Sequence, residues 1–115
     1  MDSPPRERPR SEDAMGLFVR VASVGDIPDG TGVAVVVNGR KVALFNVSGS
    51  YHAVDGLCPH QGGPLGEGIL EGTVVTCPWH FWQFDVVKGH APDFPEASIV
   101  KLAVRVVDGE IQVEV

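Results

Sequence analysis

Two short loops that each combine one cysteine with one histidine constrain this chain more than any other feature. The first loop reads Cys58-Pro59-His60 and the second reads Cys77-Pro78-Trp79-His80, and both cysteines of the chain lie in them. A proline directly after each cysteine stiffens the backbone and lowers the entropy cost of ordering the loop. The pattern predicts a metal site whose ligands are Cys58, His60, Cys77 and His80.

The mixture of ligand types within each loop indicates which metal centre to expect. Thiolates together with imidazoles suit either tetrahedral zinc or an iron–sulfur cluster. A zinc finger usually holds its cysteines in one knuckle and its histidines in another, whereas each loop here holds one of each. In a two-iron cluster, one iron can take both cysteines and the other both histidines, so that each loop spans the pair. The residues favour the cluster and leave zinc, or no metal, as alternatives.

At these loops the sequence resembles the Rieske-type [2Fe–2S] proteins, whose motif is Cys-x-His, a spacer and Cys-x-x-His. The resemblance is greatest to the stand-alone ferredoxins of multicomponent oxygenases. It includes Cys58–Leu65, the turn Gly66–Gly68, and Trp82-x-Phe84-Asp85 followed by Gly89, and it covers about residues 18–115. The resemblance implies an all-β Rieske fold, an antiparallel β-sandwich or barrel with a small inserted cluster-binding subdomain at about 56–85. It also implies one [2Fe–2S] cluster per chain, bound by Cys58, His60, Cys77 and His80.

Three departures from the family pattern bear on the properties of the site. High-potential Rieske proteins of respiratory complexes join the two loops by a disulfide, at places where this chain has Gly63 and Trp79. They also carry hydroxyl side chains where this chain has Trp82 and Phe84. Hydrogen bonds to sulfur raise the potential, so their absence implies a potential nearer about −150 mV than about +300 mV. Finally, Phe81 stands where the family more often has glycine, and a positive φ at this position would strain a phenylalanine.

The rest of the chain reads as short β-branched runs separated by turn residues. Asn38-Gly39 and Asp108-Gly109 are strong hairpin signals because these residues tolerate positive φ. No stretch has a convincing helical period, so we expect about nine short strands arranged as a sandwich or small barrel. The expected strands cover residues 18–21, 33–37, 41–47, 51–54, 73–76, 86–89, 99–107 and 111–115.

Three further side chains are given expected roles within this framework. Phe84 is expected in the core. His52 lies in a strand pattern and His90 in a proline-rich loop without a nearby cysteine, so both are expected to be surface or hydrogen-bonded residues rather than ligands.

Composition limits the class of protein. With 115 residues and 43% hydrophobic content, the chain fits one domain, which we expect over residues 16–115 after a disordered tail at 1–15. The net charge of −6 argues against nucleic acid and anionic membranes and favours a partner with a basic docking face. No apolar run is long enough to span a membrane, and both cysteines are assigned to ligation, so we expect a cytoplasmic protein, most simply a monomer.

The expected function follows from the absence of catalytic features beside the predicted cluster. The sequence contains no dinucleotide motif, no paired acid and base and no open metal position, which argues against an enzyme with a small-molecule substrate. The resemblance implies a one-electron carrier from a flavin-dependent reductase to a terminal oxygenase. The alternatives are the Rieske-like small subunit of an assimilatory nitrite reductase and a zinc-stabilised β module.

Overall fold

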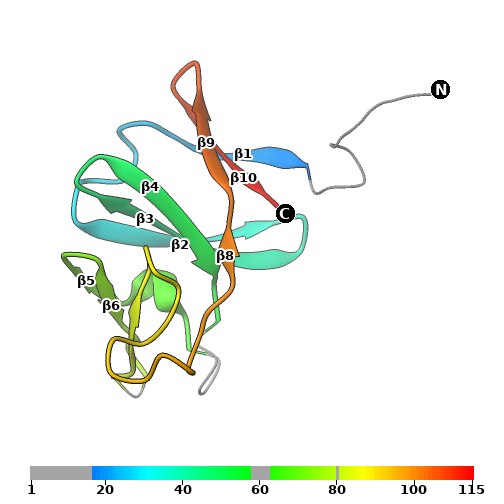
Figure 1. The fold of residues 1–115 in the computed structure, drawn as a ribbon. Helices are drawn as coiled ribbons and strands as arrows, with labels where there is room; N and C mark the ends of the chain where they lie inside the picture. The colour runs from blue at the N-terminus through cyan, green and yellow to red at the C-terminus, as the bar shows by residue number, and fades with distance from the viewer. Residues whose placement is uncertain (1–16, 58–62, 80) are drawn as a thin grey trace.

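The computed structural model describes residues 17–57, 63–79 and 81–115, and within them the chain is almost entirely β-structure (Figure 1). The ten strands of the described residues form three antiparallel sheets, with strand orders β1-β10-β9, β2-β3-β4-β8 and β5-β6-β7. The predicted all-β, antiparallel fold is therefore confirmed. The strands are β1 (Phe18–Ser23), β2 (Thr31–Val37), β3 (Arg40–Val47), β4 (Ser50–Asp55), β5 (Ile69–Glu71), β6 (Val74–Thr76), β7 (Gln83–Asp85), β8 (Lys101–Leu102), β9 (Val104–Val107) and β10 (Glu110–Glu114).

The two predicted hairpins are present with the backbone conformations that their turn residues favour. Asn38 and Gly39 have φ values of 51° and 82° and connect β2 to β3. Asp108 and Gly109 have φ values of 51° and 80° and connect β9 to β10. In both turns, two successive residues tolerate the positive φ that a tight antiparallel connection requires.

Strand β3 is the centre of the molecule because both of its faces are buried. Side chains alternate between the two faces of a strand. Val42 and Leu44 belong to a core between the β2-β3-β4-β8 sheet and the β1-β10-β9 sheet, together with Ile111 and Val113 of β10. The intervening Ala43 and the nearby Phe45 face a second core, which the segment after β4 completes.

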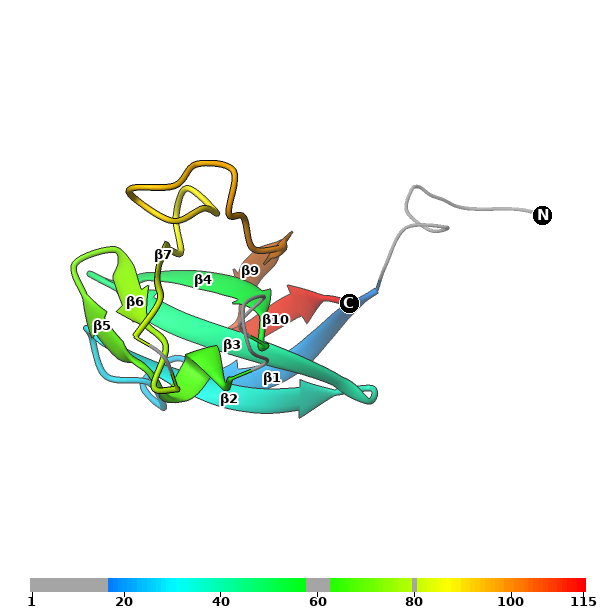
Figure 2. The same ribbon diagram turned by 90° about the horizontal axis from the view of Figure 1, so that it is seen from below.

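That second core connects the main sheets to a smaller unit at one end of the molecule. The unit contains a one-turn 3₁₀ helix, η2 (Leu65–Glu67), and the β5-β6-β7 sheet. In two perpendicular views, β5 and β6 lie away from the β9–β10 hairpin (Figures 1 and 2). Side chains of this unit pack against β3 and β4. Besides residues of those two strands, the buried residues of the second core include Leu65, Leu70, Val75, Cys77, Phe84 and Val86. Phe84 is fully buried, as predicted.

Two strand predictions were wrong. Residues 86–89 form a turn, and the strand lies just before them, at β7. The Asp85 carboxylate accepts hydrogen bonds from the N–H groups of Val87 and Lys88, and the Gly89 N–H donates to the Asp85 carbonyl, so the chain bends here. The β-branched residues Val86 and Val87 favour a strand, but the hydrogen bonds to the Asp85 side chain determine the local structure.

The predicted strand 99–107 is divided into two short strands in different sheets. β8 pairs with β4, whereas β9 pairs with β10, and Ala103 lies at the break. The chain thus passes from one main sheet to the other within a segment of partly alternating apolar and polar residues, a change of partner that no alternation pattern reveals. Strand β5 was not predicted.

Candidate metal centre

Cys77 is the one predicted ligand that lies among the described residues, and its position is closely fixed. It follows β6 directly and is only 1% exposed, within the core between the small unit and β3. Its N–H donates to the carbonyl of Trp82 (2.7 Å), and its carbonyl accepts the N–H of Phe81 (3.0 Å). The other predicted ligands, Cys58, His60 and His80, lie outside the described residues.

The second cysteine–histidine loop is the connection of the β6–β7 hairpin. Thr76 and Gln83 pair across its base, and Gln83 Nε2 donates to Thr76 Oγ1 (3.3 Å). Phe81 has a φ of 63°, so the position is indeed left-handed and strains a residue other than glycine. Such a conformation costs of the order of 1–3 kcal/mol and persists only where the surroundings enforce it. Here the hydrogen bond from Phe81 to Cys77 closes the turn.

The first loop is closed at its base by backbone pairing. Leu57 and Pro64 form an antiparallel bridge, and the Leu65 N–H donates to the Gly56 carbonyl (3.0 Å). The Gly56 N–H in turn donates to the Lys41 carbonyl (2.9 Å), which attaches the loop to β3. The two ends of the segment that contains the first cysteine and histidine are therefore held together on the central strand.

The bases of the two loops are in contact. A Cβ atom at Gly63 would lie 2.8 Å from Cys77 Sγ and 3.1 Å from Trp79 Cβ, so no larger residue fits without displacing one of them. A sulfur–metal centre needs space beside its thiolate, and Gly63 leaves that space next to the buried Cys77 thiol. The residues present therefore fit a [2Fe–2S] cluster. The same contact places Gly63 and Trp79 side by side.

Asp85 anchors the strand that leads away from the second loop. Its Oδ2 accepts the Thr73 hydroxyl (2.9 Å), and its Oδ1 accepts the N–H groups of Val87 and Lys88 (both 2.9 Å). Burial raises the pKa of this carboxyl, but the hydrogen bonds from Lys88, Thr73 and Val87 and the Lys88 charge together lower the pKa below its ordinary value. Asp85 is therefore ionised at neutral pH and holds β7 against the β5–β6 turn.

The remaining histidines are not part of a described metal site. Burial and the nearby Lys101 charge lower the pKa of His52 more than Asp85 raises it, so its imidazole is neutral at pH 7. His90 Nδ1 is 3.0 Å from the Ala91 carbonyl oxygen. Among the described residues, no three histidine, cysteine or acidic side chains are arranged to hold a metal ion.

Large apolar side chains are exposed around the two loops. Trp79 is 56% exposed and Phe81 is 76% exposed, and both lie in the second loop. Leu57, at the base of the first loop, is also exposed. Trp79 lines a surface hollow together with Gly56, Leu57 and Pro64, so the second loop extends over the base of the first. Exposed aromatic side chains beside the ligand loops are typical of a surface that contacts another protein.

Comparisons with known proteins agree with this geometry. A family model described as the Rieske [2Fe-2S] domain matches residues 18–104. The chain is 39% identical over 84 residues to the ferredoxin component of naphthalene 1,2-dioxygenase/salicylate 5-hydroxylase systems from Ralstonia sp, covering 73% of this chain and 81% of that protein.

Two solved structures are similar over most of the chain. One is the complex of reduced oxygenase and oxidised ferredoxin in carbazole 1,9a-dioxygenase, with a TM-score of 0.79, 29% identity, and 86% of this chain and 94% of that chain covered. The other is a putative NADH-dependent nitrite reductase small subunit from Mycobacterium tuberculosis, with a TM-score of 0.77, 30% identity, and 86% and 95% covered.

These matches decide between the two metals that the ligand types left open, and they confirm the predicted cofactor, a [2Fe–2S] cluster. Buried Cys77, the Gly63 contact and the hairpin loop are the parts of such a site that the described residues contain. The chain belongs to the Rieske [2Fe-2S] domain family.

Proposed function

We propose that this protein is a one-electron carrier that accepts electrons from a flavin-dependent reductase and delivers them to a terminal oxygenase. The observation that carries the proposal is its 39% identity to a dioxygenase-system ferredoxin component across 81% of that relative's length. The similarity to a structure of ferredoxin in complex with its oxygenase supports the same partner class. The protein has no reaction of its own in this scheme and acts as a component of an oxidoreductase system.

We propose Cys58, His60, Cys77 and His80 as the four ligands of the cluster. The donor types and their spacing support the set, as does the burial of Cys77 beside Gly63. When bound, a Rieske cluster supplies reversible one-electron chemistry. The two thiolates would hold one iron and the two imidazoles the other.

The remaining residues of the site assist transfer through burial and exposure. Cys77 is shielded from water by core side chains, which protects its sulfur from oxidation and exchange. A histidine that binds metal through one ring nitrogen keeps a second nitrogen that can hold a proton, so His60 and His80 would couple the potential to pH. The exposed aromatic side chains Trp79 and Phe81 provide a surface for a partner next to the ligand loops.

We propose that the domain comprises residues 16–115, after an N-terminal tail at residues 1–15 that lies outside the described residues, and that the protein acts as a monomer in the cytoplasm. Composition supports the tail, and the lack of cysteines beyond the proposed ligands supports a reducing compartment. Within the described residues, no helix has the length and apolar character needed to span a bilayer.

Reconstitution tests the function. The cluster-loaded protein is mixed anaerobically with NADH and a flavoprotein reductase, and the visible spectrum is recorded before and after an oxidised Rieske oxygenase is added. We expect bleaching by one electron per chain and rapid recovery on adding the oxygenase. A protein that the reductase reduces but no oxygenase reoxidises would contradict the proposal.

A second candidate is the small subunit of a nitrite reductase, which the 30% identity to the Mycobacterium tuberculosis protein supports. Affinity purification of the tagged protein from its own cells distinguishes the two. Recovery of a large reductase in a stable complex would favour the subunit, whereas an electron carrier is expected to elute alone.

A further inference from the structure

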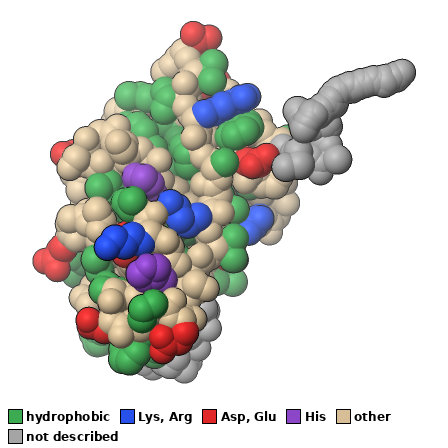
Figure 3. Space-filling model, in the orientation of Figure 1, with side chains coloured by type: hydrophobic (Ala, Val, Ile, Leu, Met, Phe, Trp, Pro, Cys, Tyr) green, Lys and Arg blue, Asp and Glu red, His purple; other side chains and the backbone are tan. Residues whose placement is uncertain are grey.

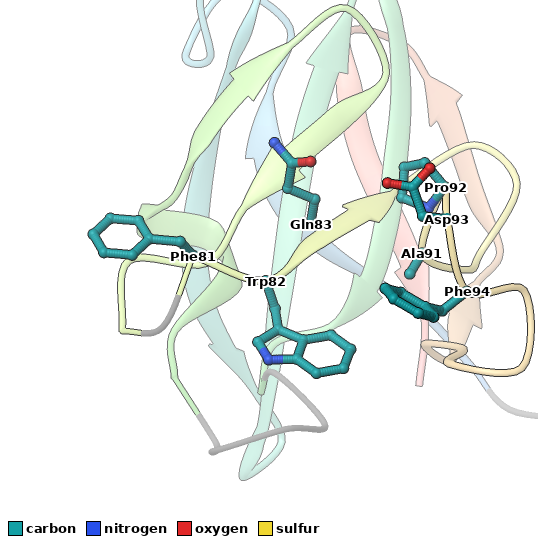
Figure 4. Close-up of a pocket in the computed structure, with 7 residues that line it drawn as sticks. All are labelled: Phe81, Trp82, Gln83, Ala91, Pro92, Asp93 and Phe94. Atoms are coloured by element: carbon teal, nitrogen blue, oxygen red, sulfur yellow. The ribbon is translucent and has the colours of Figure 1, made fainter.

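A pocket of about 260 Å³ lies directly beside the second ligand loop (Figure 4). It is formed where the start of β7 faces the loop that follows the Val86–Gly89 turn. The pocket is lined by Phe81, Trp82, Gln83, Ala91, Pro92, Asp93 and Phe94. Nothing in the electron-transfer chemistry requires it.

The aromatic side of the pocket consists of Trp82 and Phe94. Their ring centroids are 6.2 Å apart and their planes are inclined by 41°. Trp82 also stacks on buried Phe84, with ring planes 20° apart, so its position is fixed by the core. Phe94 is 54% exposed and covers the outer edge. The π faces of such rings attract cations.

The polar side of the pocket offers oxygen acceptors. Figure 4 shows the Asp93 carboxylate on the loop that carries Phe94, whereas the Gln83 amide lies on the opposite side of β7 from the Trp82 ring. Gln83 Nε2 donates to Thr76 Oγ1, so this amide is engaged within the β6–β7 hairpin and Asp93 is the charged group of the pocket. Asp93 is exposed and forms no ion pair with any described residue.

One chemical group satisfies both sides of this pocket. An anion would be repelled by Asp93, and a purely apolar ligand would make no favourable contact with this charge. A guanidinium is flat enough to stack on an aromatic ring, carries a full positive charge and presents five N–H donors. We infer that this pocket binds an arginine side chain of the redox partner protein, an assignment that rests on the proposed function.

The position and charge of the surface fit this occupant. Phe81, at one edge of the pocket, follows the proposed ligand His80 directly, so an arginine bound here would bring its protein to the ligand loops. On the face drawn in Figure 3, hydrophobic and acidic side chains are visible at this end, and the basic ones lie farther up, near the histidines. The net charge of −6 favours the approach of a basic surface.

Binding of two matched probes to the oxidised, cluster-loaded protein tests the pocket. Nα-acetyl-arginine amide carries the guanidinium, and Nα-acetyl-citrulline amide has nearly the same shape without the charge. Dissociation constants come from ligand-observed saturation-transfer NMR. We expect the arginine probe to bind at least about fivefold more tightly than the citrulline probe, the size of one desolvated cation contact.

Two variants assign the binding to the pocket. Asp93→Asn keeps the shape and removes the charge, and we expect it to weaken the arginine probe about fivefold. Glu96→Gln removes an exposed charge of the same sign three residues further on and should leave binding unchanged. Equal binding of the two probes, or equal effects of the two variants, would overturn the assignment.

The source of the arginine is tested separately, by stopped-flow electron transfer to the oxygenase. Asp93→Asn should lower the second-order rate constant and weaken its dependence on salt, whereas Glu96→Gln should change both less. If the Asp93→Asn variant binds the arginine probe more weakly but transfers electrons at the wild-type rate, the partner assignment is wrong. The probe titration needs no redox partner, so its failure would not contradict the proposed function. If the reductase failed to reduce the protein, a positive titration would still support the pocket.

Discussion

Phe81, directly after the proposed ligand His80, has a strained backbone conformation. Its φ of 63° lies in a region that side chains other than glycine avoid, and its ring is 76% exposed, so burial does not offset the strain. The hydrogen bond from its N–H to the Cys77 carbonyl fixes the turn whichever residue is present. The side chain is therefore retained at a cost in stability, in the place where a partner would make contact.

Replacing Phe81 with glycine should stabilise the protein. Relief of the left-handed backbone should contribute about 1–2 kcal/mol, and the extra freedom of glycine in the unfolded chain should offset about half of it. We expect the midpoint of thermal unfolding of the cluster-loaded protein to rise by a few degrees. Phe94→Gly is the control, because Phe94 is similarly exposed but has no positive φ. A comparable fall in both variants would contradict the strain argument.

Gly63 should be required for loading of the cluster. In Gly63→Ala the added methyl group would approach Cys77 Sγ to 2.8 Å, so the thiol must move. Overpacking of this kind costs about 1–3 kcal/mol. We therefore expect the iron content per chain to fall by more than half. Gly72→Ala is the control, because its φ of 63° makes alanine unfavourable but no atom lies within 4 Å of the new Cβ. Equal iron loss in both variants would show that general destabilisation releases the metal.

At the scale of elements, pairing and burial were easier to predict than capping. The Asn38-Gly39 and Asp108-Gly109 turns carry their conformational preference in their own residues, so both hairpins could be predicted. The Val86–Gly89 turn depends instead on the Asp85 carboxylate, and the division of 99–107 depends on which sheet each half pairs with. A sequence pattern contains neither kind of information.

Asp85 should make the β7 end sensitive to acid. The pKa of Asp85 in the unfolded chain is about 3.9. Its pKa in the folded protein lies below that value. Its stabilising effect is therefore fully present above about pH 4 and is lost as the pH falls through the lower, folded value. In Asp85→Asn the unfolding midpoint should be lower than in wild type at pH 6, and the difference should shrink toward pH 3. Exposed Glu71→Gln serves as control and should show no such convergence.

At the scale of the whole molecule, the site could be predicted as a set of donors but not as a surface. The spacing of cysteine and histidine predicted a metal site without any knowledge of the fold, and the comparisons decided between a cluster and zinc. The pocket that Gln83 and Asp93 line forms only because the turn after β7 brings the 91–94 loop back beside residues 81–83, so no sequence pattern marks it. The position of β3, whose central residues Val42–Asn46 are buried and connect the two cores, also emerges only from the packing.

Changing one proposed imidazole ligand to a thiolate should lower the reduction potential. His60→Cys adds one negative charge to the site, so an extra electron becomes harder to accept, and the potential should move toward the about −400 mV of all-cysteine clusters. Its dependence on pH should also weaken, because one titratable imidazole is gone. His90→Cys is the matched control at a histidine outside the proposed ligands. Potentials measured by protein-film voltammetry that are unchanged in His60→Cys would remove His60 from the ligand set.

Mössbauer spectroscopy of the ⁵⁷Fe-loaded protein tests most directly whether the two loops hold one pair of irons with unlike ligands. We predict two iron environments in equal amounts, with the ferrous signal of the reduced protein confined to the histidine-ligated iron. Two equivalent irons with sulfur ligands only, or correctly folded protein that repeatedly contains no iron after anaerobic preparation, would contradict the account.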